Sequence, residues 1–301
     1  MSVLVIGSLI VDNTLYVEKI PKKGETLIAQ SSLRSLGGKG ANQAIATRLA
    51  GADVNFIGCV GDDSEGILYK NHLEKHKISS SSIITSDQEP TGSAFISVDE
   101  GGENSIVVNP GANHALTPEH LDKHINLFKK SEIMLLQLEV PMETITHACH
   151  LARANDLSVL INPSPWNPAF NTEDFPCDVL ILNEIEAAQI SGTLNMTKSL
   201  ESFRPFDLNM IIITQGSEPT LFMSGSGQIM KSRPPSVKVK DTVGAGDAFT
   251  GALAASLLEG RTVPQSIHFA NTAGSISVTK AGAQGATPTK KEIESFLSNY
   301  Q

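Results

Sequence analysis

Short runs of apolar residues alternate along this chain with longer stretches in which apolar residues recur at helical spacing. The runs are rich in Ile, Leu and Val and are bounded by Gly, Asn or Pro, which is typical of buried strands. We expect strands over residues 3–7, 54–59, 133–138, 159–162, 179–182 and 210–214. We expect helices between them, over residues 41–50, 64–75, 118–130, 142–155 and 185–191. This alternation predicts βαβ units, and therefore an α/β fold with a parallel sheet covered by helices on both faces.

Two segments interrupt this alternation. The first, residues 14–36, contains two strand-like pieces, Leu15-Tyr16-Val17 and Thr26-Leu27-Ile28. The second contains a hairpin signal, because residues 94–98 and 105–108 flank the dipeptide Gly101-Gly102. Hairpins pair antiparallel and do not join a parallel core easily. We therefore expect a single domain over residues 1–301 with a small antiparallel lid, formed by residues 13–36 and 91–110, over the carboxyl ends of the main strands.

The composition limits the partners of this domain. The formal net charge of −9 argues against nucleic acid and membrane surfaces, which favour basic patches, although a local cradle can still hold a nucleotide. Cys59, Cys149 and Cys177 are odd in number and widely spaced, which predicts neither a disulfide framework nor a zinc site. The first residues lack the basic region and cleavage site of a signal peptide, and no apolar run approaches the length of a membrane span. These features predict a soluble cytoplasmic protein.

The stretch from Asp241 to Ala252 carries the strongest chemical signal. Glycines at 244 and 246 let the backbone turn with its N–H groups on one side, and a helix that begins near Gly246 adds its unpaired first-turn amides. Such a site favours an anionic group such as a phosphate. Asp247 would repel that group unless a proton must be removed nearby, and a kinase needs this combination. The residues alone leave a simpler interpretation open, a tight strand-to-helix turn in which Asp247 complements the helix dipole.

A second glycine-rich run follows the first lid segment and opens a helix: Gly37-Gly38-Lys39-Gly40-Ala41-Asn42-Gln43-Ala44. Alone it is a weak signal. Together with the run that contains Gly244-Ala245-Gly246-Asp247, it resembles the paired signature of the ribokinase-like (PfkB) family of sugar kinases. Shorter stretches extend the resemblance over nearly the whole chain: Val5-Ile6-Gly7-Ser8, Gly61-Asp62-Asp63, residues 109–113, Leu136-Gln137-Leu138-Glu139, Asn162-Pro163 and Gly282-Ala283-Gln284.

The resemblance implies a three-layer α/β/α domain whose β-sheet lid often forms the dimer contact, so we expect a homodimer through the lid. It also implies transfer of the γ-phosphoryl group of ATP to a primary hydroxyl of a sugar, here the 5-hydroxyl of a pentose. By this resemblance Asp247 removes the hydroxyl proton, and the amides of Gly244, Ala245 and Gly246 stabilise the negative charge that develops. These are the roles that the local chemistry of the run also favours.

The resemblance assigns a further set of residues to the sugar. The matching positions are Ile10, Asp12, Gly38, Lys39, Asn42 and Glu139, together with Asp247. Carboxylates and an amide can each bind adjacent hydroxyls, and a glycine lets the backbone approach the ring. Without the resemblance, Asn42 is interpreted as a residue at a helix start, and Glu139 as a residue that precedes the helix start at Pro141.

Residues toward the C-terminus match the family's nucleotide and cation positions. For ATP these are Asn183, Glu186, Thr214, Gly216, Ser217, Gly246 and Asn271, with Glu186 helping to hold hydrated Mg²⁺ and Asn271 beside the adenine. Similar enzymes also bind an activating K⁺, and the matching positions are Asp241, Val243, Ser277, Lys280, Gly282 and Ala286. Lys280 would coordinate only through its carbonyl oxygen, because its ammonium group would repel the ion. Without the resemblance, Glu186 is a solvated charge on a helix and Asn271 an ordinary residue of the helix after Pro264.

Two positions depart from the family pattern. Ile10 stands where ribokinases carry an asparagine that binds the sugar, and deoxyribokinases carry an apolar residue there. A buried hydroxyl without a hydrogen-bond partner costs about 1–3 kcal/mol, so one interpretation is that the substrate is a 2-deoxy sugar. The alternative is that Ile10 points into the core and ribose is bound by the other groups. Pro219 stands where the ATP loop usually ends in glycine, and the loop must close differently because proline lacks an N–H. The alternatives to a pentose kinase are a kinase for another sugar or a nucleoside, and a sugar-binding protein without activity.

Overall fold

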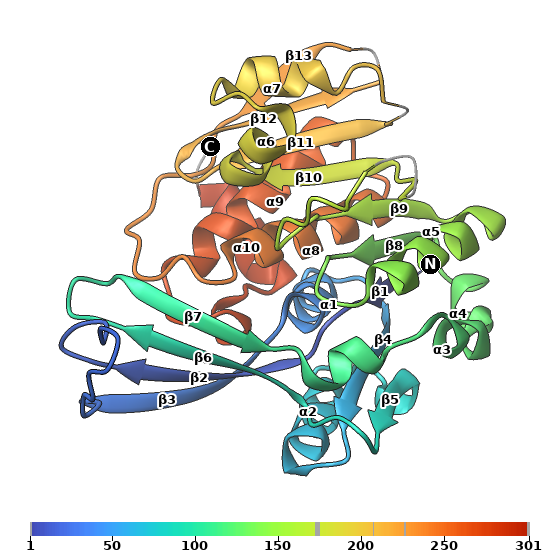
Figure 1. Cartoon of the computed structure of the whole chain (residues 1–301). Helices are drawn as coiled ribbons and strands as arrows, with labels where there is room; N and C mark the ends of the chain where they lie inside the picture. The colour runs from blue at the N-terminus through green and yellow to red at the C-terminus, as the bar shows by residue number, and fades with distance from the viewer. Residues whose placement is uncertain (1, 172–174, 207, 226, 300–301) are drawn as a thin grey trace.

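The computed structural model describes residues 2–171, 175–206, 208–225 and 227–299. Within these ranges the chain forms a nine-stranded sheet with helices on both faces and a separate four-stranded sheet (Figure 1). The large sheet contains β1 (Val3–Ile6), β4 (Val54–Gly61), β5 (Ile83–Ser86), β8 (Ile133–Leu136), β9 (Ser158–Ile161), β10 (Val179–Asn183), β11 (Met210–Gln215), β12 (Glu218–Ser224) and β13 (Ile229–Ser232). The small sheet contains β2 (Ile10–Tyr16), β3 (Ser31–Gly37), β6 (Gly92–Val98) and β7 (Asn104–Asn109). The helices are α1 (Lys39–Leu49), α2 (Ser64–Lys75), α3 (Pro118–Lys123), α4 (Ile125–Phe128), α5 (Met142–Ala154), α6 (Glu184–Ser191), α7 (Met196–Ser202), α8 (Ala245–Leu258), α9 (Val263–Ser277) and α10 (Lys290–Asn299).

The large sheet has the strand order β13-β12-β11-β10-β9-β8-β1-β4-β5. Neighbours from β11 to β5 pair parallel, whereas β12 pairs antiparallel with both β11 and β13 at one edge. The chain extends from β1 to β5 in one direction and from β8 to β13 in the other, so the order reverses between β1 and β8. Open α/β sheets bind ligands outside the carboxyl ends of their strands, beside such a reversal.

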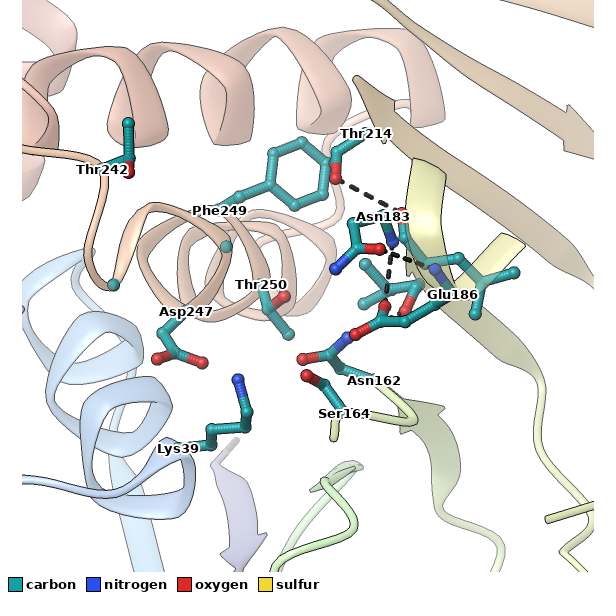
Figure 2. Close-up of a pocket in the computed structure, with 14 residues that line it drawn as sticks. Lys39, Asn162, Ser164, Asn183, Glu186, Thr214, Thr242, Asp247, Phe249 and Thr250 are labelled. Atoms are coloured by element: carbon teal, nitrogen blue, oxygen red, sulfur yellow. Dashed lines mark hydrogen bonds between the residues drawn. The ribbon is translucent and has the colours of Figure 1, made fainter. Parts of the chain in front are cut away.

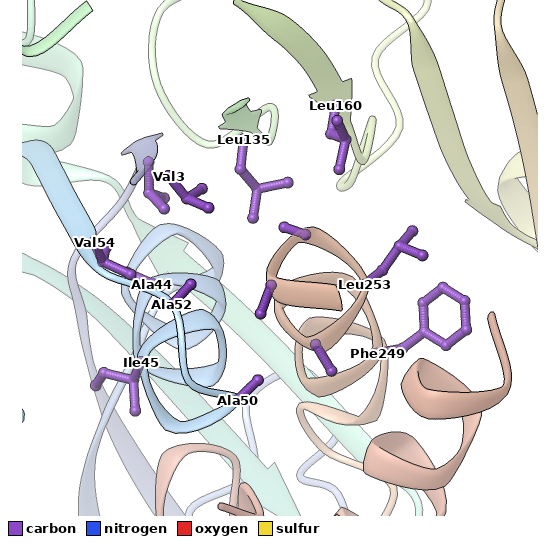
Figure 3. Close-up of a cluster of buried hydrophobic side chains, with 14 of the residues drawn as sticks. Val3, Ala44, Ile45, Ala50, Ala52, Val54, Leu135, Leu160, Phe249 and Leu253 are labelled. Atoms are coloured by element: carbon purple, nitrogen blue, oxygen red, sulfur yellow. The ribbon is translucent and has the colours of Figure 1, made fainter. Parts of the chain in front are cut away.

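Buried strands give the large sheet two apolar faces. Val3 and Val5 belong to the hydrophobic cluster on one face, whereas Leu4 and Ile6 belong to the cluster on the other. This alternation follows from the period of two along a strand. Figure 3 shows the first cluster between the sheet and helices α1 and α8, where Leu253 of α8 is fully buried. The three-layer α/β/α architecture is therefore confirmed.

Most of the predicted core elements are present. The predicted strands correspond to β1, β4, β8, β9, β10 and β11, and four of the predicted helices correspond to α1, α2, α5 and α6. The single helix predicted over residues 118–130 is wrong: the structure has two short helices, α3 and α4, separated at His124. His124 has φ −109° and ψ 19°, outside helical geometry, so the hydrogen-bond ladder restarts there. The edge strands β5 and β13, strand β12 beside β13, and helices α7 and α10 were not predicted.

The small sheet has the order β3-β2-β6-β7. The β2–β3 and β6–β7 pairs are antiparallel and the central β2–β6 pair is parallel. The predicted hairpin between β6 and β7 is present, and its turn closes with the Gly102 amide on the Asp99 carbonyl at 2.9 Å. The predicted strand-like piece over Thr26-Leu27-Ile28 is wrong, because the partner of β2 is Ser31–Gly37 instead and Ile28 is 92% exposed.

Among the described residues, no helix has the length and apolar character needed to cross a membrane. Cys59, Cys149 and Cys177 are free thiols inside the fold, and each is buried. Burial raises the pKa of the Cys59 thiol to about 11 and that of the Cys149 thiol to about 12. These thiols therefore pack as small apolar groups and are poor nucleophiles.

Candidate active site

Helix α8 begins at the glycine-rich run, as the sequence predicts. Gly244 is its N-cap and has φ 76°, a left-handed conformation that glycine adopts readily. A Cβ at Gly244 would lie 2.7 Å from the Ala283 side chain, so this position also needs a residue without one. The Ala245 amide donates to the Thr242 carbonyl at 3.2 Å. The Gly246 and Asp247 amides belong to the first helical turn, where the helix itself supplies no acceptor.

Asp247 is held from the neighbouring helix α1. Its Oδ2 accepts from Asn42 Nδ2 and its Oδ1 accepts from Gln43 Nε2, both at 2.9 Å. The Asp247 side chain is only 7% exposed. The interpretation of Asp247 as a residue that merely complements the helix dipole therefore does not describe its surroundings, because two side-chain amides from another helix fix both carboxylate oxygens.

A cavity of about 220 Å³ opens at the N-terminal end of α8, beside the carboxyl ends of β9, β10 and β11 (Figure 2). Predicted site residues that line it are Lys39, Asn183, Glu186, Thr214, Gly244, Gly246 and Asp247. The other lining residues are Asn162, Ser164, Ile181, Leu182, Thr242, Phe249 and Thr250. The two glycine-rich runs, more than two hundred residues apart in the sequence, thus meet at one cavity.

Lys39 is the cation of this cavity, and its side chain points toward Asp247 (Figure 2). Burial alone would lower the pKa of Lys39, but the carboxylates of Asp247, Glu139 and Glu186 outweigh burial and hold it above its ordinary value. A charged ammonium group among three carboxylates leaves the cavity able to accept a polyanion, since the lysine offsets part of their repulsion.

The two carboxylates that the sequence assigns to the sugar, Asp12 and Glu139, lie around the start of α1. Glu139 Oε2 accepts from the Lys39 amide at 2.8 Å and from the Ser8 hydroxyl, and burial raises the pKa of Glu139. Burial, reinforced by the nearby Glu139 carboxylate, raises the pKa of Asp12 to about 6. Glu139 therefore binds the start of α1 through its side chain, so its role is more than that of a residue preceding the helix that begins after Pro141.

The glycine pair before α1 is required by close packing against β2. A Cβ at Gly37 would lie 2.1 Å from Asp12 Oδ2. Gly38 is the N-cap of α1 with φ 83°, and a Cβ there would lie 2.8 Å from the Ile10 amide nitrogen. The pair therefore lets the backbone pass directly beside Asp12 and Ile10.

Ile10 is buried, with 5% of its surface exposed. Among the described residues it belongs to neither hydrophobic cluster, although its neighbours Leu9 and Val11 belong to one of them. Ile10 and Asp12 are two residues apart on β2, so their side chains lie on the same face of the lid sheet. Ile10 therefore lies on the Asp12 face of β2, outside the two hydrophobic clusters.

Glu186 and Asn183 form a capping box at the start of α6. Asn183 Oδ1 accepts from the Glu186 amide at 2.8 Å, and Glu186 Oε2 accepts from the Asn183 amide at 2.9 Å. Glu186 is 5% exposed, and burial raises the pKa of its carboxyl group. Glu186 is therefore no solvated surface charge, and its carboxylate lines the cavity beside Ser164 (Figure 2).

The predicted nucleotide loop forms a tight turn between β11 and β12. Gly216 has φ 56° and, with Ser217, connects Gln215 to Glu218, which pair across the hairpin. Pro219 lies inside β12, and its carbonyl accepts from the Gln215 side chain at 2.5 Å. The loop thus closes as a hairpin despite the proline, and neither Gly216 nor Ser217 lines the cavity described above.

Asn271 is not brought to this cavity. It lies on α9 and is 4% exposed. Its Oδ1 accepts from the Thr220 hydroxyl at 2.7 Å, and its Nδ2 donates to the Ser232 carbonyl at 3.1 Å. These contacts tie α9 to β12 and β13, so the structure gives Asn271 a role in packing the edge of the sheet.

The predicted K⁺ positions lie on two adjacent segments. Asp241 Oδ1 accepts from the Val243 amide at 3.0 Å and Oδ2 from the Gly282 amide at 2.8 Å. Lys280 pairs through its ammonium group with Glu292 at 3.1 Å. In the described ranges, no cluster of three or more His, Cys, Asp or Glu side chains suits a metal ion. Each oxygen of the Asp241 carboxylate thus accepts one backbone amide and keeps a second lone pair.

Sequence reasoning missed the glutamines that surround Asp247. Gln43 and Gln137 lie within the quoted glycine-rich and Gln-Leu-Glu runs, and Gln284 follows Gly282-Ala283, but none was assigned to the site. All three are buried, two of them completely. A signal was present, because a glutamine at an apolar position of a predicted helix or strand needs a buried hydrogen-bond partner.

Comparison with known proteins gives matches over the full length of the chain. A model of the pfkB family of carbohydrate kinases matches residues 1–290. The ribokinase of Bacillus subtilis is 35% identical over 297 residues, covering 99% of this chain and 99% of that protein. The deoxyribokinase of Salmonella typhimurium is 33% identical over 309 residues and covers 99% of each. The structure of Arabidopsis thaliana ribokinase complexed with ribose and ATP has a TM-score of 0.91 at 26% identity, covering 98% of both chains.

Proposed function

Because this chain belongs to the pfkB family of carbohydrate kinases, we propose that it transfers the γ-phosphoryl group of ATP to the 5-hydroxyl of a pentose, ribose or 2-deoxyribose. The observation that carries the proposal is a buried carboxylate, Asp247, in the first turn of α8 and in one cavity with Lys39. Full-length similarity to proteins named ribokinase and deoxyribokinase supports a pentose as the acceptor, over another sugar or a nucleoside. A sugar-binding protein without activity would have no use for this carboxylate beside an anion site.

Each group of the cavity has a role in this reaction. Asp247 removes the proton of the attacking hydroxyl, which lies on its exposed edge. The backbone amides from Gly244 to Gly246 stabilise the negative charge on the transferred group, together with the helix dipole. Because the Ala245 amide already bonds to Thr242, the Gly246 amide is the freer donor in this structure. Lys39 offsets phosphate charge from the sugar side.

Magnesium fits the nucleotide side of the cavity. Glu186 is a buried carboxylate with one oxygen bonded to the Asn183 amide, and Ser164 also hydrogen-bonds to it. A single carboxylate suits Mg²⁺, which usually keeps several waters and binds phosphates directly. When bound, the ion supplies charge neutralisation for the phosphate groups. The chain's own contribution is to orient Glu186 through the capping box.

The role of Asp247 is tested by Asp247→Asn. We expect kcat for pentose phosphorylation to fall roughly 10²–10⁴-fold, because the amide cannot accept the proton. The KM for ATP stays near its wild-type value. The measurement is coupled ADP release with ribose and with 2-deoxyribose. A wild-type enzyme that consumes no ATP with any pentose would contradict the proposed function itself.

The pentose is proposed to be distinguished at Ile10. Its burial on the Asp12 face of β2 supports an apolar contact with the sugar at this position, where a hydroxyl would find no partner. We therefore propose that 2-deoxyribose competes with ribose as the substrate. The ratio of kcat/KM for the two sugars tests this, and a preference for ribose above roughly tenfold would overturn it.

We further propose that the enzyme is a homodimer that associates through the lid. Strand register puts Thr14, Leu33, Ile106 and Val108 on the same face of the lid as Asp12. Leu33, Ile106 and Val108 are exposed by 50%, 53% and 50%. An apolar sheet face that continues from a sugar site needs a cover, and a second copy of the same face supplies one.

A further inference from the structure

Two chains of side-chain amides end on Asp247. Gln43 donates to its Oδ1 and Asn42 to its Oδ2, both at 2.9 Å. Behind Gln43, Gln137 Nε2 donates to Gln43 Oε1 at 2.6 Å. Behind Asn42, Gln284 Nε2 donates to Asn42 Oδ1 at 2.9 Å. Each carboxylate oxygen of Asp247 is therefore backed by two amides in succession.

The members of these chains come from separate parts of the fold. Gln43 lies on α1, Gln137 directly after β8, and Gln284 at the start of the short 3-10 helix Gln284–Ala286. Gln43 and Gln137 are fully buried and Gln284 is 7% exposed. Buried amides destabilise a fold unless they are hydrogen-bonded, so each one must be held by the others.

The orientation of the Gln137 amide indicates that the direction of these hydrogen bonds matters. Its Oε1 is buried without a hydrogen-bond partner in the described part of the chain, whereas its Nε2 donates to Gln43. Leaving a buried acceptor unpaired is costly. In this orientation Gln137 donates to Gln43 and Gln43 donates to Asp247, and hydrogen bonds aligned in one direction polarise and strengthen one another. Donors on both oxygens favour the ionised carboxylate of Asp247, and only the ionised carboxylate can remove a proton.

Gln284 fixes which group Asn42 presents to the sugar. The oxygen of Asn42 is taken by Gln284 and one N–H is taken by Asp247. The second N–H of Asn42 is its remaining donor, so Asn42 can donate to a sugar hydroxyl. A hydroxyl that accepts from Asn42 keeps its own proton free for Asp247. Gln284 is itself anchored, because its Nε2 also donates to the Tyr69 hydroxyl at 3.0 Å.

We propose that Gln43, Gln137 and Gln284 are positioning residues for the proton transfer. Gln43 and Gln137 hold one oxygen of Asp247 in place, and Gln284 sets the amide orientation of Asn42. This assignment rests on the proposed role of Asp247 as the base. The three glutamines act on the reaction through Asp247 and Asn42.

Methionine substitutions test the amide chain that runs from Gln137 through Gln43 to Asp247, because methionine keeps the length and apolar stem of glutamine and removes its donors. We expect Gln43→Met to lower kcat about 10²-fold, as for a misplaced catalytic group, with the pentose KM unchanged. Gln137→Met removes one neutral hydrogen bond farther from the base and lowers kcat about fivefold. The double variant has the kcat of Gln43→Met alone, because Gln137 acts only through Gln43.

Two further variants test the rest. Gln43→Glu keeps the acceptor for Gln137 but replaces the donor to Asp247 and Asn162 by a second carboxylate, so we expect a loss of at least about 10²-fold in kcat. Gln284→Met releases the amide of Asn42, so the pentose KM rises and kcat falls while the ATP KM stays constant. Ser256→Ala is the matched control: Ser256 lies on α8 with Asp247, and the change removes its buried hydrogen bond of 3.0 Å to Ser266 of α9 and leaves kcat unchanged.

Each outcome of these measurements decides the inference. If the effects of Gln43→Met and Gln137→Met on kcat multiply in the double variant, Gln137 does not act through Gln43. A raised pentose KM with unchanged kcat in these variants would likewise overturn their role in proton transfer. Unchanged kinetics in Gln284→Met would overturn the proposal that Gln284 orients the amide of Asn42. If the wild type is active and Asp247→Asn is not, while Gln43→Glu has wild-type kcat, only this inference fails. Pentose phosphorylation that survives Asp247→Asn contradicts the role of Asp247 as the base, whereas a wild type that phosphorylates no pentose contradicts the proposed function.

Discussion

Asp12 couples stability to pH through a single buried carboxyl group. Burial raises its pKa from 3.8 to about 6, so the folded protein binds this proton more tightly than the unfolded chain does. The resulting stability is fully present below the unfolded pKa and is lost as the pH rises through about 6. We expect Asp12→Asn to raise the melting temperature at pH 8 and to change it little at pH 4. Thermal unfolding at both values checks this, and an equal shift at both would contradict it.

Ile10 is the residue at which the sugar preference should change. We expect Ile10→Asn to restore a partner for a hydroxyl of ribose and to raise the kcat/KM ratio of ribose to 2-deoxyribose. A buried hydrogen bond of about 1–3 kcal/mol corresponds to roughly 5–150-fold in that ratio. Ile10→Val is the control, since it keeps an apolar side chain and should keep the wild-type ratio. Identical ratios in all three proteins would show that Ile10 does not face the sugar.

At the scale of elements, the site depends on how closely α1 approaches α8. A Cβ at Gly251 would lie 2.5 Å from Ala46 Cβ and 2.8 Å from the Gln43 carbonyl oxygen. Gly251→Ala therefore pushes the helices apart and moves Gln43 away from Asp247. We expect a loss of about 1–3 kcal/mol in the free energy of unfolding and at least roughly tenfold in kcat.

Gly225→Ala provides the matched control for this helix contact, because a Cβ there meets nothing within 4 Å. Chemical denaturation and steady-state kinetics on both variants separate the two effects. Gly251→Ala with wild-type kcat would mean that the base keeps its position when the helices separate.

The segments around Asp241 and Gly282 form the element for which we propose an activating K⁺. The Lys240 and Asp241 amides both bond to the Val278 carbonyl, at 2.7 Å and 3.2 Å, so the segments are already joined without an ion. Replacing K⁺ by Li⁺ should lower kcat and also lower the melting temperature, because an ion that binds only the folded state stabilises it. Equal melting temperatures and rates in both salts would contradict the site.

The sequence predicts those parts of the fold and site that depend on local pattern. Apolar runs such as Val3-Leu4-Val5-Ile6 identify the strands, and the Asn183–Glu186 spacing is that of a capping box. Contacts across the fold are a different matter. Gln43 bonds to Asp247, 204 residues away, and no periodicity reveals that partner. The failure at Thr26 has the same cause, since two segments with strand propensity competed for one place beside β2.

At the scale of the whole molecule, the lid is the surface through which we propose that two copies associate. Its strands alternate, so neighbouring residues of β7 lie on opposite faces. Val108 and Ile106 share the face of Asp12, whereas Val107 lies on the other face with Phe95. All four side chains are at least half exposed, between 50% and 66%. Exposure alone therefore does not distinguish which face of the lid forms the proposed dimer contact. A charged residue introduced on one face and then on the other can distinguish them.

We expect Val108→Lys to dissociate the homodimer, because an unpaired ammonium group in an apolar contact is costly to desolvate. Val107→Lys is the matched control: it adds the same charge at the adjacent, equally accessible position and should leave the dimer intact. Light scattering coupled to size exclusion measures the mass of each protein. Loss of the dimer should also raise the pentose KM of Val108→Lys, since the face of Asp12 would lose its cover. A monomeric wild type, or dissociation by Val107→Lys alone, would exclude association through this face of the lid.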